Sequence, residues 1–213
     1  MNKKFGQIWS FVANDIKKKI IKGIISPGTR LKISELASKY NVSETPVREA
    51  IRLLASAGFV DSIPRKMVIV KEITMEEMID VYTIQVVLEG LAAKFAVSRG
   101  GNKLIKKLET LNGHMKQWLE YDDFDRFVQA NQEFHQTIIR ASKNKKLIEV
   151  LENLRDQVHR YRFMQLSQPG RPNQSLKEHQ QILMAFKSGD ADFCEKCVKD
   201  HINMAINIIK NCI

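Results

Sequence analysis

The stretch SELASKYNVSETPVREAIRLLASAG, residues 34–58, decides the fold of the N-terminal third of the chain. Two short helical patterns with a break between them are typical of two helices joined by a tight turn. Ser34 is predicted to cap the first helix, and Asn41 to turn the chain, because asparagine tolerates a left-handed backbone. The second helix carries one predicted buried stripe, with the spacing i, i+3, i+4 and i+7. Its members are Val47, Ala50, Ile51 and Leu54.

The other side of the second helix is polar. Ser43 or Thr45 is predicted to cap this helix, and Pro46 falls in its first turn, where proline is tolerated. Thr45, Arg48 and Arg52 lie opposite the apolar stripe. Arginine bonds guanine bidentately or holds phosphate, so this face suits a DNA major groove. The alternative is the solvated face of an ordinary helical hairpin.

The charge of the chain is unevenly distributed. Residues 1–72 contain 14 lysines and arginines and 6 acidic residues, which gives +8 of the formal net charge of +10. The other 141 residues are nearly neutral. Basic charge concentrated around a helix-turn-helix pattern is the electrostatic footprint expected of a nucleic-acid-binding domain.

The flanking sequence completes a small domain. A helix is predicted over residues 8–25, ending at the turn signal Ser26-Pro27-Gly28. Two β-prone runs, residues 59–63 and 67–70, are separated by Pro64-Arg65-Lys66 and predict a hairpin. Three helices followed by a two-stranded hairpin form a winged helix.

After a short linker the chain reads as helical to its end. The predicted fold is mainly α, with a winged helix-turn-helix domain at residues 1–71 and an all-α bundle of about six helices at residues 75–213. The helices of the bundle are predicted at residues 75–98, 102–120, 123–141, 144–166, 175–188 and 191–211.

Four residues of the bundle have the spacing of a metal site. Asn131 and His135 are four residues apart on one helix and share a face, and His179 and His201 lie within the last two helices. Three imidazoles and an amide oxygen from three helices could converge on one divalent ion. An alternative zinc set, Cys194-Cys197 with His201, is disfavoured because a CxxC within a helix is a poor tetrahedral site and buried cysteine is an ordinary core residue.

Residues 8–70 resemble the DNA-binding domain of the GntR family of bacterial transcription regulators. The matching segments are PGTRL at 27–31, ELA at 35–37, NVSETPVREAIRLL at 41–54 and AGFV at 57–60. The resemblance implies that one set of residues approaches the major groove, namely Ser43, Thr45, Arg48 and Arg52. The wing, with Arg65 and Lys66, would then approach the minor groove. Glu44 departs from the family, in which a basic residue is frequent there, and Met67 stands where the wing often has glycine.

Residues 75–211 resemble the FCD effector domain of the FadR-type branch of that family. The resemblance is carried by NQEFHQTIIRASKN at 131–144, KEHQQILMAFKSGD at 177–190 and His201. It implies a divalent metal, zinc with nickel as the alternative, held by Asn131, His135, His179 and His201. Asparagine replaces the family's usual aspartate, which predicts weaker metal binding. A second departure is Gln85, which stands where the family often has arginine.

The sequence therefore predicts a cytoplasmic DNA-binding regulator and not an enzyme. We expect a homodimer on a pseudo-palindromic operator, controlled by an organic acid that the metal binds and that Gln85, with Arg155 or Arg162, orients. No apolar run approaches the roughly 18 residues of a membrane span, so no membrane segment is expected. One alternative is a DNA-binding regulator whose bundle only dimerises, without metal or effector. The other is a metalloenzyme built on the bundle, but HExxH is absent and an enzyme would not explain the basic N-terminal third.

Overall fold

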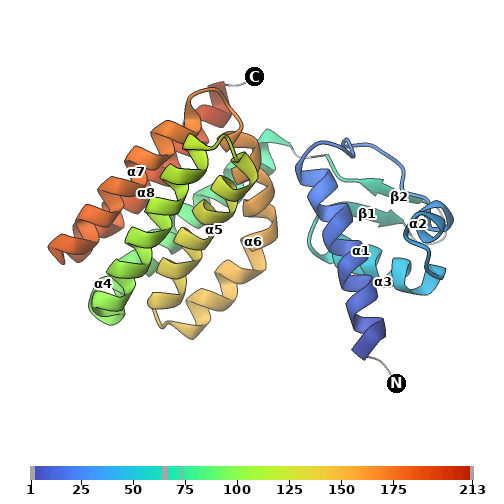
Figure 1. Cartoon of the computed structure of the whole chain (residues 1–213), viewed down its shortest axis with the longest axis horizontal. Helices are drawn as coiled ribbons and strands as arrows, with labels where there is room; N and C mark the ends of the chain where they lie inside the picture. Colours follow the sequence, from blue (N-terminus) through green and yellow to red (C-terminus); the bar gives the residue numbers. More distant parts are fainter. Residues whose placement is uncertain (1–2, 64–66, 73, 212–213) are drawn as a thin grey trace. The chain divides into compact units, whose positions relative to one another are not determined.

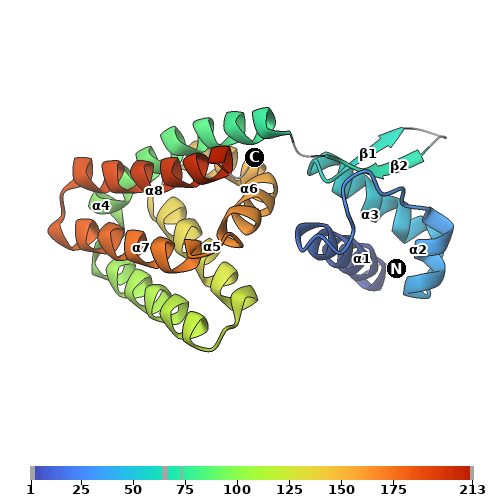
Figure 2. The same ribbon diagram turned by 90° about the horizontal axis from the view of Figure 1, so that it is seen from above.

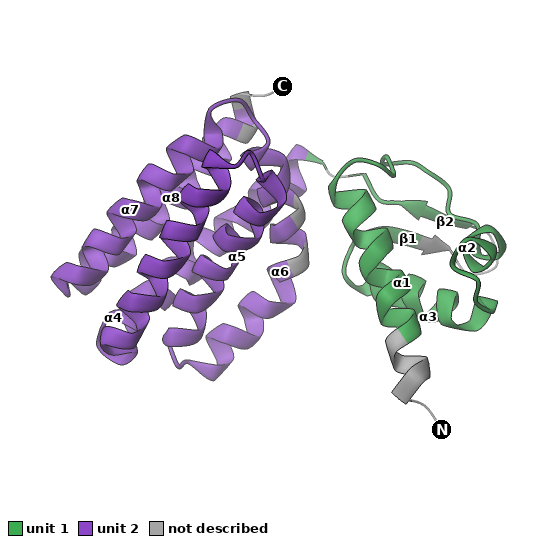
Figure 3. Ribbon diagram, viewed as in Figure 1, with its two compact units in different colours: residues 1–74 green, residues 75–213 purple. Residues whose placement is uncertain are grey.

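The chain forms two compact units, residues 1–74 and 75–213 (Figure 3). The structure, a computed structural model, describes residues 3–63, 67–72 and 74–211. The division lies between Thr74 and Met75, at the start of the helical bundle. Each unit has its own helices and its own buried core, and each is described separately below.

The first unit is a winged helix-turn-helix, as predicted (Figure 1). Its elements are α1 (Lys3–Ile21), α2 (Ile33–Tyr40), α3 (Glu44–Ser56), β1 (Val60–Ile63) and β2 (Met67–Val70). The two strands pair antiparallel, with Val60 opposite Val70. Arg30 adds an isolated bridge to Ile69, which connects the segment before α2 to the wing.

Apolar stripes on α1 and α3 form the core of this unit. The predicted stripe of α3 is buried, and so are Val12, Ile16 and Ile20 on α1. Each buried valine, leucine or isoleucine of these stripes contributes about 1.5–3 kcal/mol by leaving water. The hydroxyl of Tyr40 donates a 2.6 Å hydrogen bond to the Asp15 carboxylate and so ties α2 to α1.

Two predicted helix ends of this unit were wrong, and a third prediction was right in part. α1 ends at Ile21 and not at residue 25, because Gly23 adopts a φ of +71° that no helix can continue. Ser34 lies inside α2, whose capping position is Lys32. Of the two residues predicted to cap α3, Ser43 holds the capping position, without a side-chain cap bond, and Thr45 is inside the helix. The predicted left-handed turn at Asn41 is confirmed, with φ 51° and ψ 50°.

The second unit is a helical bundle, as predicted. Its elements are α4 (Met75–Glu120), α5 (Phe124–Ala141), α6 (Lys145–Leu166), α7 (Arg171–Ser188) and α8 (Ala191–Asn211). The long helix α4 packs against each of the other four. α7 and α8 lie side by side in both views (Figures 1 and 2).

One predicted boundary within the bundle is confirmed and another is wrong. α4 contains both helices expected at 75–98 and 102–120, and the predicted break between them is a kink at Gly101, whose φ of 62° and ψ of −168° are not helical but are accessible to glycine. α7 begins at Arg171 and not at residue 175. Gly170, with φ 75°, takes the capping position, and Pro172 is tolerated in the first turn.

The expectation about apolar runs also needs correction. α4 contains an 18-residue window with a mean hydropathy of 1.3, long and apolar enough by composition to cross a membrane, of which 39% is buried inside the bundle. The core helix of a bundle passes the same test, and α4 packs on four neighbours. The hydropathy of α4 is therefore accounted for in part by its place in the core.

Candidate functional site

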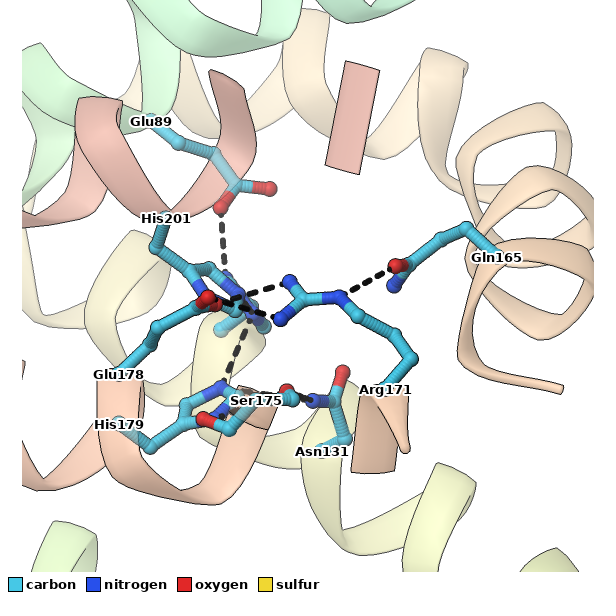
Figure 4. Close-up of polar contacts among 9 residues, drawn as sticks. Glu89, Asn131, Gln165, Arg171, Ser175, Glu178, His179 and His201 are labelled. Carbon is cyan, nitrogen blue, oxygen red and sulfur yellow. Dashed lines mark hydrogen bonds and ion pairs between the residues drawn. The ribbon is translucent and has the colours of Figure 1, made fainter. Parts of the chain in front are cut away.

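Three histidines from three helices meet in the interior of the bundle. His135 lies on α5, His179 on α7 and His201 on α8, and each is at most 6% exposed. Figure 4 shows His179 and His201. The Nε2 atom of His135 is 3.3 Å from Nε2 of His179 and 3.2 Å from Nε2 of His201. Within the described part of the chain, these three form the cluster with metal-ligand spacing.

The other ring nitrogen of each histidine faces an oxygen acceptor. Nδ1 of His135 lies 2.8 Å from the Glu89 carboxylate, and Nδ1 of His201 lies 2.6 Å from the Glu178 carboxylate. Nδ1 of His179 lies 2.7 Å from the backbone carbonyl of Ser175. Each Nδ1 must therefore carry the proton and donate. In the neutral rings all three Nε2 atoms then present lone pairs to one another.

This arrangement has the dimensions of a metal site. Two nitrogens that are each about 2.1 Å from one ion lie roughly 3.0–3.4 Å apart at angles of 90–109°. Two of the three separations, 3.3 and 3.2 Å, fall within that range, and all three nitrogens lie within 4.8 Å of one another. Histidines that bind metals almost always donate their second N–H to a carboxylate or carbonyl, as all three do here. The residues therefore fit a divalent ion.

Burial keeps the three rings neutral. Burial lowers the pKa of His135 well below its usual value, and the positive charge of Arg162 adds to the effect. Burial also lowers the pKa of His179 far below that value, helped by the other two histidines. For His201 burial again lowers the pKa, although Glu178 opposes the shift. Neutral imidazole is the form that binds metals, so the site needs no proton release near pH 7.

Asn131 lies beside this cluster with one polar atom unsatisfied. The residue is 1% exposed, and its Oδ1 has no hydrogen-bond partner. Its Nδ2 lies 3.3 Å from the Ser175 hydroxyl and 3.4 Å from Nε2 of His179. Because the two ends of an amide are interchangeable by rotation, Oδ1 can turn toward the histidines and act as a fourth ligand.

An arginine holds the Glu178 carboxylate in place. Arg171, 2% exposed, donates two 2.8 Å hydrogen bonds to Glu178 and a third, also 2.8 Å, to the side chain of Gln165 (Figure 4). Burial alone would raise the pKa of Glu178, but hydrogen bonds from His201 and Arg171 outweigh it and hold that pKa below its usual value. The carboxylate is therefore ionised and oriented toward His201.

The residues predicted to contact an effector lie together near Oε1 of Glu89, the carboxylate oxygen that does not contact His135. Gln85, Arg155 and Arg162 line a cavity of about 10 Å³, room for about one water molecule, together with Glu89 and Gln136. Nε2 of Gln85 donates a 2.6 Å hydrogen bond to Glu89, and Nη2 of Arg162 lies 3.6 Å from the same carboxylate. The Oε1 atoms of Gln85 and Gln136 are buried without a partner.

The sequence interpretation missed the residues that support the histidines. Glu178 directly precedes His179, but one helical step turns it toward α8, where it contacts His201. Arg171 lies between the predicted helices 144–166 and 175–188, where the sequence predicts a loop. Tyr82, with its hydroxyl buried and unpartnered on α4, also escaped notice. Gln85 lies three residues and Glu89 seven residues after Tyr82, so the three side chains share one face of the helix. This spacing is the sequence signal that could have identified Tyr82.

The cysteine alternative finds no support in the structure. Neither Cys194 nor Cys197 belongs to the metal-spaced cluster found among the described residues. Cys194 is buried, and burial raises the pKa of its thiol to about 12. A thiol held in its protonated form is a poor metal ligand.

The predicted DNA-facing residues of α3 are exposed. Ser43, Thr45, Arg48 and Arg52 all lie on the surface, opposite the buried stripe. Arg48 makes a 2.7 Å ion pair with Glu44, and Arg52 makes a 2.6 Å pair with Glu49. Exposed pairs of this kind contribute about 0–1 kcal/mol, so phosphate can replace them. The other two predicted residues, Arg65 and Lys66, lie outside the described part of the chain.

Comparison with known proteins agrees with both units. Residues 9–70 match the family "Bacterial regulatory proteins, gntR family", and residues 80–204 match the FCD domain family. An uncharacterized HTH-type transcriptional regulator of Bacillus subtilis, YdhC, is 27% identical over 191 residues, 89% of this chain and 85% of the relative. The transcriptional repressor RspR of Escherichia coli is 27% identical over 187 residues, 88% of this chain and 82% of the repressor.

A solved structure extends the likeness to the whole chain. The structure of Escherichia coli McbR/YncC superposes with a TM-score of 0.79 at 25% identity, covering 96% of this chain and 97% of that one. Both units match families of transcriptional regulators, and the relatives that span most of the chain are transcriptional regulators too. The chain is therefore a regulator and not an enzyme. The chain belongs to the GntR family of bacterial transcription regulators, with an N-terminal DNA-binding helix-turn-helix domain and a C-terminal FCD effector-binding domain.

Proposed function

We propose that this regulator binds a pseudo-palindromic operator as a homodimer and that an organic acid, bound at a metal ion in the FCD domain, controls its affinity for DNA. The ligands would be His135, His179, His201 and Asn131. The observation that carries the proposal is the inward orientation of three Nε2 lone pairs whose Nδ1 atoms are all engaged. Zinc is the preferred ion and nickel the alternative, since imidazole suits both.

The charge balance around the site supports an anionic effector. The nearby carboxylates, Glu89, which is buried, and Glu178, which is partly buried, are matched by the guanidinium groups of Arg162 and Arg171. The proposed ligands are all neutral, so a bound ion keeps its double positive charge. A carboxylate is attracted to that charge.

The chain's own residues would orient the acid. Nη2 of Arg162 lies 3.6 Å from Oε1 of Glu89, which is too far for a strong hydrogen bond. Arg171, in contrast, makes two 2.8 Å hydrogen bonds with Glu178. Arg162 can therefore turn toward an anion with little loss. Gln85 offers an unpartnered oxygen to a hydroxyl of the effector, and Arg155 lines the same cavity. Tyr82, which also carries an unpartnered hydroxyl, adds a donor on the same helix.

Signal transmission follows from the position of α4. Gln85 and Glu89 are carried by the helix that begins at Met75, directly after the linker. An effector that binds them better in one conformation of α4 shifts the population of that conformation. The DNA affinity would change by the coupling free energy, typically about 1–3 kcal/mol. A regulator of this kind acts where the chromosome is, which places it in the cytoplasm.

Effector screening on metal-loaded protein tests this function. Organic acids are added to zinc-loaded and chelator-treated protein, and the thermal midpoint is measured by differential scanning fluorimetry. We expect stabilisation by an acid in the zinc-loaded protein, and its loss in His179→Gln but not in His114→Gln, an exposed histidine of the same domain. No metal uptake and no acid response would favour the alternative, a regulator whose bundle only dimerises, without metal or effector.

A further inference from the structure

An acidic side chain stands at the start of the second helix of the helix-turn-helix. Glu44 is the first residue of α3 and is exposed, as are its neighbours Ser43 and Thr45. The N-terminal residues of this helix are the ones that contact base edges when it lies in a major groove. Residues 1–72 contain 14 basic and 6 acidic residues, so the domain attracts phosphate, and a carboxylate at this point weakens that attraction.

Glu44 is joined to an arginine on the same side of α3. Nη2 of Arg48 donates a 2.7 Å hydrogen bond to Oε2 of Glu44, one helical turn earlier. The side chains of Glu44 and Arg48 are 48% and 57% exposed. This bond engages one carboxylate oxygen and one guanidinium nitrogen, and a guanidinium group has five N–H donors. The pair therefore presents donors and an acceptor side by side at the surface.

The major-groove edges of the bases limit what a carboxylate can bind. A carboxylate accepts hydrogen bonds and cannot donate them, so phosphate and the acceptors of guanine and thymine repel it. The donors are the amino groups of adenine and cytosine. In an A·T pair the amino group lies between two acceptors, adenine N7 and thymine O4. In a G·C pair both acceptors belong to guanine, and cytosine N4 stands at one side of them, so a carboxylate meets less repulsion there.

The order of groups in the pair of Arg48 and Glu44 matches the edge of a G·C pair. An arginine donates to guanine O6 and N7, and a carboxylate beside it then lies next to N4 of the paired cytosine. The hydrogen bond between the two side chains keeps the donors and the acceptor adjacent. On the basis of the operator binding proposed above, we infer that Arg48 and Glu44 together read one G·C base pair, Arg48 at the guanine and Glu44 at the cytosine.

Selection from a random library of DNA duplexes tests which base pair Glu44 prefers. Full-length wild type, Glu44→Gln and Glu49→Gln are selected in parallel. Glu49 is the matched control, because it makes a 2.6 Å pair with Arg52 on the same helix and its side chain is 41% exposed. The wild type and the control should select a G·C pair at one position of the half-site. Glu44→Gln should prefer A·T there by at least about fivefold, because an amide bonds adenine N6 and N7.

A cytosine analogue tests the contact at the level of one amino group. In the selected operator this cytosine is replaced by 2-pyrimidinone, which lacks the 4-amino group. The binding of the wild type should weaken at least about fivefold in a mobility-shift titration. Glu44→Ala, which has no carboxylate to lose the contact, should change by less than about twofold with the same replacement, while keeping the wild-type circular dichroism spectrum.

The contrary results separate this contact from operator binding itself. If Arg48→Ala binds the operator as tightly as the wild type, this side of α3 does not read DNA and the G·C contact fails with it. If Arg48→Ala binds more weakly but Glu44→Gln selects the same bases as the wild type, the DNA-facing side stands and Glu44 reads no base. A uniform gain in affinity for Glu44→Gln, with a steeper salt dependence, would also contradict the contact, because Glu44 would then only repel phosphate.

Discussion

The Glu89 carboxylate on α4 accepts a 2.8 Å hydrogen bond from Nδ1 of His135 on α5 and a 2.6 Å hydrogen bond from Gln85. One buried acid thus connects a proposed metal ligand to a proposed effector residue. It also fixes the tautomer of His135, so that Nε2 is free to bind an ion. The helix that leaves the linker is in this way joined directly to the proposed metal site.

Glu89→Gln tests this connection. The substitution keeps the shape of the side chain but removes its negative charge, so His135 becomes a weaker ligand and Arg162 loses its ionic partner. We expect zinc affinity to fall about 10–100-fold, the usual effect of losing such a hydrogen-bond partner. Titration with a competing chelator measures the change, and Glu133→Gln, an exposed acid on α5, serves as the control. Equal zinc affinity in wild type and Glu89→Gln would show that Glu89 does not support the site.

Arg171→Met tests the buried ion pair that orients His201. Removing one partner leaves Glu178 charged and partly desolvated, and breaking a buried pair costs about 3–5 kcal/mol. Because the Glu178 side chain keeps 15% exposure, we expect the lower end of that range, about 3 kcal/mol. Urea unfolding measures the loss. Lys146→Met breaks an exposed pair with Glu149 and should cost at most about 1 kcal/mol. Comparable losses in the two variants would contradict a special role for Arg171.

The pKa shifts of the histidines predict how acid affects the metal-free protein. In the folded state the pKa values of His135 and His179 lie well below 6.5, whereas unfolded histidine titrates near 6.5. Below about pH 6.5 the unfolded chain therefore binds more protons, and the free energy of unfolding decreases as the pH falls. The thermal midpoint of chelator-treated protein should drop between about pH 7.5 and pH 5.5.

His179→Gln should lose part of this acid sensitivity, because it removes one of the buried groups that must stay neutral. His114→Gln, at an exposed position, should keep all of it. If His179→Gln and the wild type lost stability in parallel, the pKa of His179 would not be depressed in the folded state.

Arg48→Ala tests the DNA-facing side of α3. Loss of one set of base or phosphate contacts should weaken operator binding by about 1–3 kcal/mol in a mobility-shift titration. Arg140→Ala, which removes an exposed arginine of the FCD domain, should leave operator affinity unchanged. Unaltered binding by Arg48→Ala would mean that another surface reads the operator.

Local patterns in the sequence were sufficient to predict the fold. The stripe of α3, the left-handed Asn41 and the two-stranded wing all follow from spacing and turn chemistry that act over a few residues. One error concerns a glycine that has two roles. Gly170 belongs to the predicted loop, but it also caps α7, which moves the start of that helix to Arg171.

The site could be predicted only in part, because spacing shows which residues share a face and not how far they reach across a bundle. His135, His179 and His201 were named as one set, and the structure brings their Nε2 atoms together. The contacts of Glu178 with His201 and of Arg171 with Glu178 depend on how α7 packs against α8. No pattern within one helix contains that information.

Metal content measured together with operator affinity tests the central claim most directly. The purified protein is loaded with zinc, dialysed and measured by elemental analysis, and its operator affinity is then titrated with and without a stabilising acid. We predict one ion per wild-type chain, an acid-dependent change in operator affinity of about 5–150-fold, and the loss of both in His179→Gln but not in His114→Gln. A wild-type protein that holds no zinc or nickel after loading would contradict the account.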